Sequence, residues 1–135
     1  MKKVYLIGHG NKKLPEFTSQ LKEKNVNALI DVRSIPYSRF AFQFNRENIK
    51  KYMETEGISY IYMGDLLGGK KEEGFEEYMK SEAFKEAIAK LKEEAGRFIP
   101  AIMCAETDHA KCHRRFIGAE LKEFDVEAIG GIKKK

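Results

Sequence analysis

The residues best suited to chemistry are concentrated in one short segment that holds both cysteines of the chain. It reads Cys-Ala-Glu-Thr-Asp-His-Ala-Lys-Cys-His-Arg-Arg over residues 104–115. Cys112 precedes a predicted helix, whose first N–H groups and partial positive charge favour a thiolate and bound anions. Cys104 ends an apolar run, where a buried small side chain is an equally good interpretation. The two cysteines are therefore candidates for a nucleophile or a redox pair, and acid–base candidates lie nearby in sequence or in the predicted fold. These are His9, Glu106 and His113.

Several established cysteine and phosphate motifs are absent from the chain. A Cys-x5-Arg cradle would need Arg at position 110 or 118, which hold Ala and Gly. The spacing of the cysteines matches neither a thioredoxin-like pair nor a zinc site, so we predict no metal. Gly8-His9-Gly10 lacks the third glycine of a dinucleotide fingerprint, and residues 64–74 lack the P-loop pattern. The sequence identifies no cofactor.

A second polar group follows the predicted strand at residues 27–32. Only six of the 25 basic residues are Arg, and five of the six lie at or beside the ends of predicted strands. Arg is preferred to Lys where carboxylate or phosphate is held through two hydrogen bonds. We therefore predict a site for a small phosphate- or nucleotide-like anion, although such residues also brace irregular loops. Its predicted ligand residues are Asn11, Asp31, Arg33, Ser38, Arg39, Arg114 and Arg115.

Three phenylalanines alternate within the loop predicted at residues 33–44. Phe40, Phe42 and Phe44 are interleaved with Arg39 and Arg46, and aromatic rings with Arg can stack nucleotide bases. We nevertheless expect the three rings to cover the sheet edge or to pack on the following helix, as most large apolar side chains do.

The elements that must position these residues alternate along the chain. Strands are predicted at 4–7, 27–32, 58–62, 98–104 and 126–129, and helices at 15–24, 45–57, 74–80, 81–95 and 112–123. Such alternation predicts an α/β fold in which helices cover both faces of a mostly parallel sheet. The candidate residues follow the strands, so they should share the carboxyl edge, where sheets of this kind bind ligands.

Composition limits the class of protein. The chain has 135 residues, 42% hydrophobic and 34% charged, which excludes disordered, collagen-like and membrane-spanning chains. We expect one domain over residues 1–132 and a basic tail over 133–135. Without that tail the net charge of +4 falls to +1, so net charge is weak support for a nucleic-acid partner. The apolar run near the N-terminus is too short for a signal peptide or a membrane span, and a cytoplasmic protein is expected.

Four motifs in order make the chain resemble an uncharacterised family, the domain of unknown function 488. They are Ile7-Gly8-His9-Gly10, Asp31-Val32-Arg33-Ser34 with Pro36 and Ser38, Phe44-Asn45, and Cys104-Ala105-Glu106 with Cys112-His113-Arg114. The resemblance implies a small cytosolic bacterial or archaeal protein with a Rossmann-like three-layer sandwich, and it brings no established reaction. The usual Gly-His-Ser is Gly8-His9-Gly10 here, so a hydroxyl at position 10 is not essential.

Three functions stay open at this stage. The first is a pocket of Arg, His and Cys at the carboxyl edge that binds a small anion, with or without thiol chemistry. The second is a nucleic-acid-binding module that uses the Arg and Phe residues with the Lys tail. The third is a structural or regulatory domain in which the polar residues only fix the loops. The sequence does not give the oligomeric state.

Overall fold

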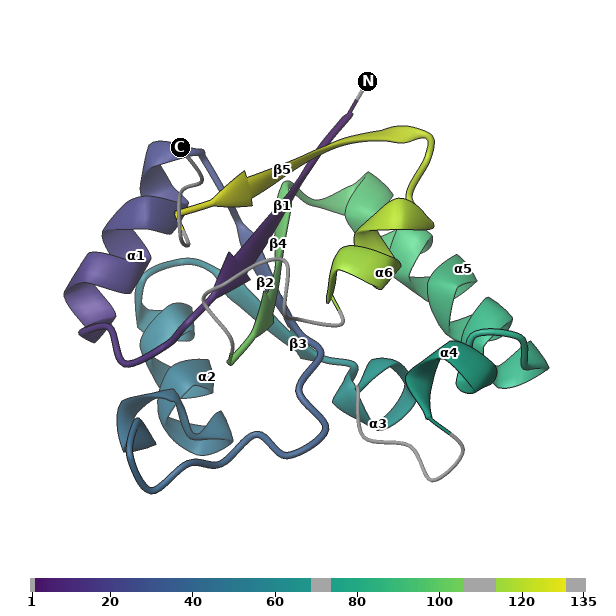
Figure 1. The fold of residues 1–135 in the computed structure, drawn as a ribbon. Coiled ribbons are helices and arrows are strands. Elements are labelled where there is room, and N and C mark those ends of the chain that lie inside the picture. Colours follow the sequence, from purple (N-terminus) through teal and green to yellow (C-terminus); the bar gives the residue numbers. More distant parts are fainter. Residues whose placement is uncertain (1, 69–73, 106–113, 131–135) are drawn as a thin grey trace, which may run out of the picture.

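The architecture is that of a parallel sheet between two layers of helices (Figure 1). We describe a computed structural model, which covers residues 2–68, 74–105 and 114–130, with the backbone alone at Arg114 and Arg115. The strands are β1 (Lys2–Gly8), β2 (Ala28–Asp31), β3 (Ser59–Tyr62), β4 (Pro100–Cys104) and β5 (Phe124–Ile129). The helices are α1 (Leu14–Glu23), η1 (Phe42–Phe44), α2 (Arg46–Thr55), α3 (Gly64–Leu67), α4 (Phe75–Tyr78), α5 (Glu82–Arg97) and α6 (Arg114–Ala119). The predicted α/β fold is confirmed, and all strand pairs in the sheet are parallel.

The strands lie in the order β3-β2-β4-β1-β5, so that β4 occupies the centre of the sheet between β2 and β1. The register places Gly8 beside Cys104 and Asp31 beside Met103, so these three strands end at nearly the same level. Their carboxyl ends therefore form one edge, as the sequence predicts.

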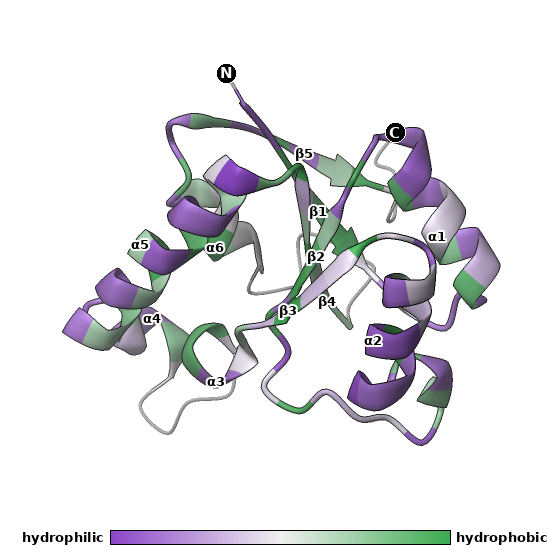
Figure 2. Cartoon of the chain, turned by 180° about the vertical axis from the view of Figure 1, so that it is seen from behind, coloured by the Kyte–Doolittle hydropathy of each residue, from purple (hydrophilic) through white to green (hydrophobic). Residues whose placement is uncertain are grey.

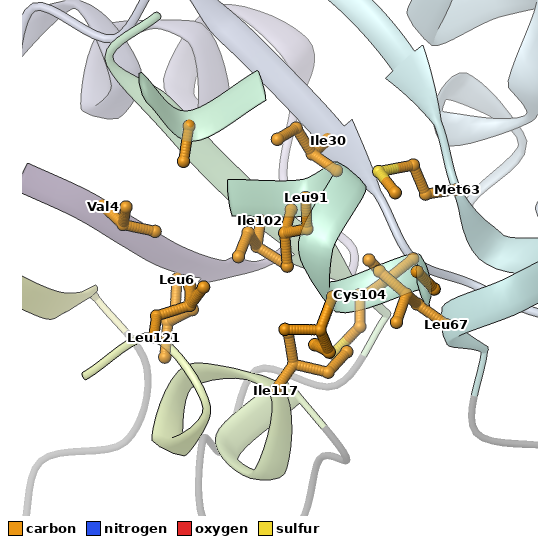
Figure 3. Packing of buried hydrophobic residues seen from close by; sticks show 14 of the residues in the cluster. Val4, Leu6, Ile30, Met63, Leu67, Leu91, Ile102, Cys104, Ile117 and Leu121 are labelled. Carbon is orange, nitrogen blue, oxygen red and sulfur yellow. The ribbon is translucent and has the colours of Figure 1, made fainter. Parts of the chain in front are cut away.

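Alternation along each strand divides the core between the two faces. Tyr5 and Ile7 of β1 join the cluster that contains Phe17 of α1 and Ile49 of α2. Val4 and Leu6 point to the other face, where the cluster contains residues of α5 and α6 (Figure 3). β2, β4 and β1 from Val4 onward are buried throughout, as expected for central strands covered on both faces, whereas the edge strands β3 and β5 are partly exposed. In Figure 2 the helices carry both hydrophilic and hydrophobic residues, as expected for elements with one buried side.

The chain leaves neighbouring strands toward opposite faces. After β1 and β2 it continues into α1 and α2, which pack on one face, whereas after β4 it continues to α6 on the other. Such a reversal opens a crevice at the carboxyl edge of a parallel sheet, where ligands of α/β proteins bind. In this sheet the connections change sides between β2 and β4 and again between β4 and β1.

One local expectation is wrong: Phe44 is buried as expected, but Phe40 and Phe42 are exposed rather than packed. Gly64–Leu67 form the short helix α3. Asn45 holds the N-cap position of α2 without a side-chain cap bond, because its Oδ1 accepts from the backbone N–H of Ser38 at 2.7 Å. No helix in the described ranges is both long and apolar enough to cross a membrane.

Candidate functional site

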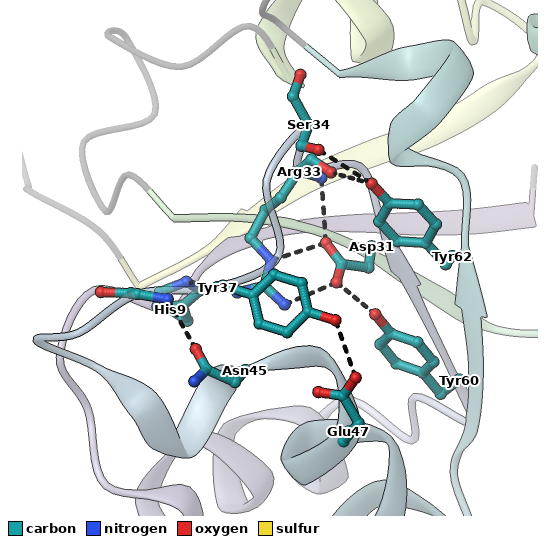
Figure 4. A network of polar contacts seen from close by, with 10 residues as sticks. His9, Asp31, Arg33, Ser34, Tyr37, Asn45, Glu47, Tyr60 and Tyr62 are labelled. Atoms are coloured by element: carbon teal, nitrogen blue, oxygen red, sulfur yellow. Dashed lines mark hydrogen bonds and ion pairs between the residues drawn. The ribbon is translucent and has the colours of Figure 1, made fainter.

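An ion pair between Asp31 and Arg33 is the centre of the candidate site (Figure 4). The guanidinium donates through Nε to Oδ1 at 2.9 Å and through Nη2 to Oδ2 at 2.7 Å. The backbone N–H of Arg33 donates to the same Oδ1 at 3.1 Å. The Asp31 side chain is fully buried and that of Arg33 is 5% exposed. Two parallel hydrogen bonds fix the plane of the guanidinium and balance its charge.

His9 joins this pair from the end of β1. Its Nδ1 lies 2.7 Å from the carbonyl oxygen of Gly10, and its Nε2 lies 3.2 Å from Nη1 of Arg33. A carbonyl oxygen only accepts, so the proton is on Nδ1, and Nε2 accepts from Arg33. The ring stacks on Phe44 with the centroids 4.4 Å apart. Burial lowers the pKa of His9 to about 4; the bond to Gly10 opposes this shift and the charge of Arg33 adds to it.

Two tyrosines of the edge strand β3 complete the network, and the sequence analysis missed both. The hydroxyl of Tyr60 donates to Oδ2 of Asp31 at 2.5 Å. The hydroxyl of Tyr62 donates to the carbonyl oxygens of Arg33 and Ser34 at 2.8 and 3.2 Å. Burial, followed by the charge of Asp31, raises the pKa of Tyr60 and of Tyr62, so both are protonated donors at neutral pH. The parallel pairing of Asp31 with Tyr62 is the signal that would have found them.

The other predicted anion-binding residues that precede β3 in the sequence do not join this network. The Oγ of Ser38 accepts from the backbone N–H groups of Phe40 and Ala41, each at 3.1 Å, which fixes the loop. Asn11 Oδ1 accepts from Nε2 of Gln43 at 3.3 Å. Arg39 is exposed, and within the described chain its side chain has no hydrogen-bond or ion-pair partner. The structure therefore joins Asp31, Arg33 and His9 and leaves these three residues outside the network.

The cysteine segment is described only in part. Cys104, the last residue of β4, is buried in the apolar cluster below α6 and is disulfide-bonded. The carbonyl oxygen of Cys104 accepts from the backbone N–H of His9 at 2.9 Å, which brings the cysteine backbone to the network. Arg114 and Arg115 begin α6. The predicted residues Glu106, Cys112 and His113 lie outside the described residues.

We next consider the described surface outside the network. Where residues are described, no group of three or more His, Cys, Asp or Glu side chains could hold a metal ion. A surface hollow of about 410 Å³ is lined by Glu54, Gly57, Ile58, Ser59 and Tyr60. It extends over the start of β3, toward the amino edge of the sheet, and its lining shares Tyr60 with the network.

Comparison of the sequence with known proteins identifies a family whose function is unknown. Residues 13–121 match the family described as "Domain of unknown function DUF488", so the matched region includes Asp31, Arg33 and both tyrosines and begins after His9. No curated protein and no solved structure matches the chain significantly. Because the matched region is most of the chain, this protein belongs to the DUF488 family.

Proposed function

We propose that the carboxyl edge around Asp31, Arg33 and His9 binds a small anionic ligand of the phosphate or nucleotide class. The observation that carries this proposal is the position of a buried ionic network beside β4, where the connections between strands change sides. Connections from β1 and β2 leave for one face there, and the connection from β4 leaves for the other. Such reversals at the carboxyl edge are the usual ligand sites of parallel α/β sheets.

The cost of burying the ion pair supports a functional role. Removing two charges from water costs several kcal/mol each, and apolar residues of similar volume are often as stable or more stable. A buried pair at the ligand-binding edge is therefore better explained by a ligand than by stability alone. Arg33 has five N–H donors, and within the described residues its hydrogen bonds to Asp31 and His9 use three of them, so the guanidinium has further N–H groups for an acceptor on a ligand.

Positive charge on the loop that follows Arg33 is available for the same ligand. Arg39 is exposed and unpaired within the described chain, on the loop that leaves β2. It can reach a phosphate without breaking a structural contact. Asp31, in contrast, is saturated by Arg33 and Tyr60 and acts on a ligand only by orienting the guanidinium.

His9 supports binding rather than proton transfer. Both ring nitrogens are already bonded, to Gly10 and to Arg33, and the side chain is buried. With its pKa lowered to about 4, the ring is neutral at physiological pH. We therefore assign His9 the role of holding Arg33 in place, and we assign no reaction to the site.

The thiol part of the proposal is a redox role for Cys104. A nucleophilic cysteine needs an accessible thiolate, whereas Cys104 is buried and disulfide-bonded. Quantification of thiols in the denatured protein, purified without reductant, tests this. We expect no reactive thiol before reduction and two after it, because the chain has two cysteines. Two reactive thiols without reduction would contradict the redox role.

Thermal denaturation with added anions tests the binding site. Phosphate, sulfate and AMP are each compared with sodium chloride at equal ionic strength. At least one of the three should raise the melting temperature, and the rise should level off as its concentration increases. A ligand at 100 times its Kd stabilises by about 2.7 kcal/mol. Arg39→Gln should weaken this response. Arg97→Gln, which removes the same charge at the opposite edge after α5, should leave it unchanged. A flat response to all three anions, or an equal response in both variants, would contradict the proposal.

A further inference from the structure

The large exposed hydrophobic side chains of the described residues all lie on one edge of the molecule. Four belong to the loop between β2 and α2: Ile35 (57% exposed), Tyr37 (49%), Phe40 (83%) and Phe42 (64%). The fifth is Leu66 in α3, which follows β3 at the same edge. Single exposed apolar residues need no explanation, but a concentration on one segment marks an interaction surface. We call residues 35–42 the aromatic loop; Figure 1 shows it running below the sheet between β2 and α2.

The exposure of these rings is imposed by the backbone. Pro36 accepts through its carbonyl oxygen from the N–H of Arg46 at 2.9 Å, and the carbonyl oxygen of Phe42 accepts from Nδ2 of Asn48 at 2.8 Å. The Oγ of Ser38 holds the N–H groups of the two residues before Phe42. The loop is therefore tied to α2 while its rings point to solvent. Presenting rings on a fixed backbone reduces the entropy lost when a partner binds.

Charge around the aromatic loop selects an anionic partner. Residues 31–51 contain five basic and two acidic residues, whereas the remaining chain without the Lys tail contains 17 basic and 19 acidic residues. Arg33 is neutralised by Asp31, but Arg39, Arg46 and Lys50 are exposed. The guanidinium of Arg46 lies 4.3 Å from the ring centroid of Tyr62, which holds it at the same edge. A purely apolar protein interface would not need this local excess of positive charge.

We propose that the aromatic loop, with Arg39 and Arg46, binds single-stranded nucleic acid. Unpaired bases offer flat faces that stack on Phe40 and Phe42, and the neighbouring phosphates pair with the arginines. A duplex hides these faces, so it offers only phosphates to the same surface. The exposed rings carry this inference, which shares Arg39 with the proposed small-anion site but does not rest on the buried network.

Fluorescence anisotropy with a labelled 12-nucleotide oligothymidylate and the full chain tests the proposal. Binding should be measurable at low salt, weaken steeply as salt rises, and exceed binding of the matching duplex. Phe40→Ala combined with Phe42→Ala should weaken binding at least about tenfold, given the usual contribution of a stacked base. The Lys tail is the same in both proteins, so this difference isolates the rings. Arg39→Gln should weaken binding and reduce its salt dependence, and Arg97→Gln should not.

Four outcomes would overturn the inference. Undetectable binding by the folded protein at low salt, equal binding by the double Phe variant, or equal binding of duplex would each exclude base stacking on the loop. Self-association that the double Phe variant abolishes, without oligonucleotide binding, would assign the surface to a second copy of this chain. The anion response measured by thermal denaturation stays a separate readout, because the double Phe variant keeps the whole network of Arg33. Oligonucleotide binding without any response to phosphate, sulfate or AMP would support this inference while contradicting the small-anion site.

Discussion

Arg33 and His9 meet across the end of a strand that separates them in the sheet. Nη1 of Arg33 lies 3.2 Å from Nε2 of His9, although β4 lies between β2 and β1. The contact therefore joins the segments that follow two non-adjacent strands, directly above Cys104. A side-chain bridge of this kind fixes the position of both loops with respect to the central strand.

Disrupting the buried ion pair should be severely destabilising. Arg33→Met leaves the carboxylate of Asp31 buried without its main partner, which typically costs about 3–5 kcal/mol. The double variant Asp31→Asn with Arg33→Met leaves no buried charge, so it should be more stable than Arg33→Met alone. Urea denaturation measures both. Glu77→Gln, which breaks the exposed pair with Lys80, is the control and should change stability by about 1 kcal/mol or less. If the effects of Arg33→Met and of the single variant Asp31→Asn, measured in the same way, simply add up to that of the double variant, the pair is not coupled and the prediction is wrong.

The stability of the protein should depend on His9 in mildly acidic solution. Burial lowers its pKa from 6.5 in the unfolded chain to about 4 in the folded one. Between these values the unfolded state binds the proton, so stability is complete above about pH 6.5 and is lost as the pH falls toward 4. The shift corresponds to a loss on the order of 3 kcal/mol.

Urea denaturation between pH 4 and pH 7 measures this loss. His9→Gln keeps a hydrogen-bond acceptor for Arg33 and removes the titrating ring. The difference between wild type and variant should therefore depend on pH, whereas the shared titration of carboxylates cancels. Parallel stability profiles for the two proteins would show that His9 is not a buried neutral ring.

Close packing at the start of α3 should make Gly64 irreplaceable. A Cβ at this position would overlap with the backbone carbonyl of Arg33 and with the hydroxyl of Tyr62. Because a carbonyl cannot rotate away, Gly64→Ala should shift the loop after β2 and destabilise by about 1–3 kcal/mol or more. Gly96→Ala is the matched control, since nothing lies within 4 Å of its added methyl group. That control should be neutral or stabilise α5 by up to about 1 kcal/mol. Equal melting temperatures for the two variants would refute the close approach.

Two neighbouring phenylalanines should respond very differently to truncation. Phe44 is buried between His9, at 4.4 Å, and Phe17, at 4.9 Å, so Phe44→Ala should cost about 3–5 kcal/mol. Phe42 is exposed, and Phe42→Ala should change stability by about 0.5 kcal/mol or less. Thermal or urea denaturation of the two variants makes the comparison. A large cost at Phe42 would mean that the ring packs on the protein, which would also weaken the case for the aromatic loop as a surface for bases.

The sequence predicted the architecture because continuous apolar runs and helical periodicity carry that information. The alternation of strands and helices along the chain is enough to place Asp31 and His9 at a common edge. It could not give the strand order, so the bridge from Arg33 to His9 across β4 was not foreseen. Tyr60 and Tyr62 were missed because tyrosines in a predicted strand are indistinguishable from ordinary packing residues until the pairing with β2 is known.

Local geometry is hard to predict where one residue type serves two structural roles. Asn45 is a good N-cap residue, but the same carboxamide also bonds to the backbone of Ser38, and the fold uses this second interaction. Phe40, Phe42 and Phe44 are the same residue type at alternate positions of one loop. Only their tertiary contacts distinguish the buried ring of Phe44 from the two exposed rings. The functional expectations for Glu106, Cys112 and His113 concern residues outside the described part of the chain and remain predictions.

The strand order has a consequence for how the chain folds. β1 comes first in the sequence, but its two neighbours, β4 and β5, begin at Pro100 and Phe124. Its pairings therefore join residues 96 apart in sequence in β4 and 122 apart in β5, which makes contact order high and folding slow for a protein of this size. During synthesis, β1 is therefore an unpaired apolar segment until β4 and β5, in the last third of the chain, have left the ribosome.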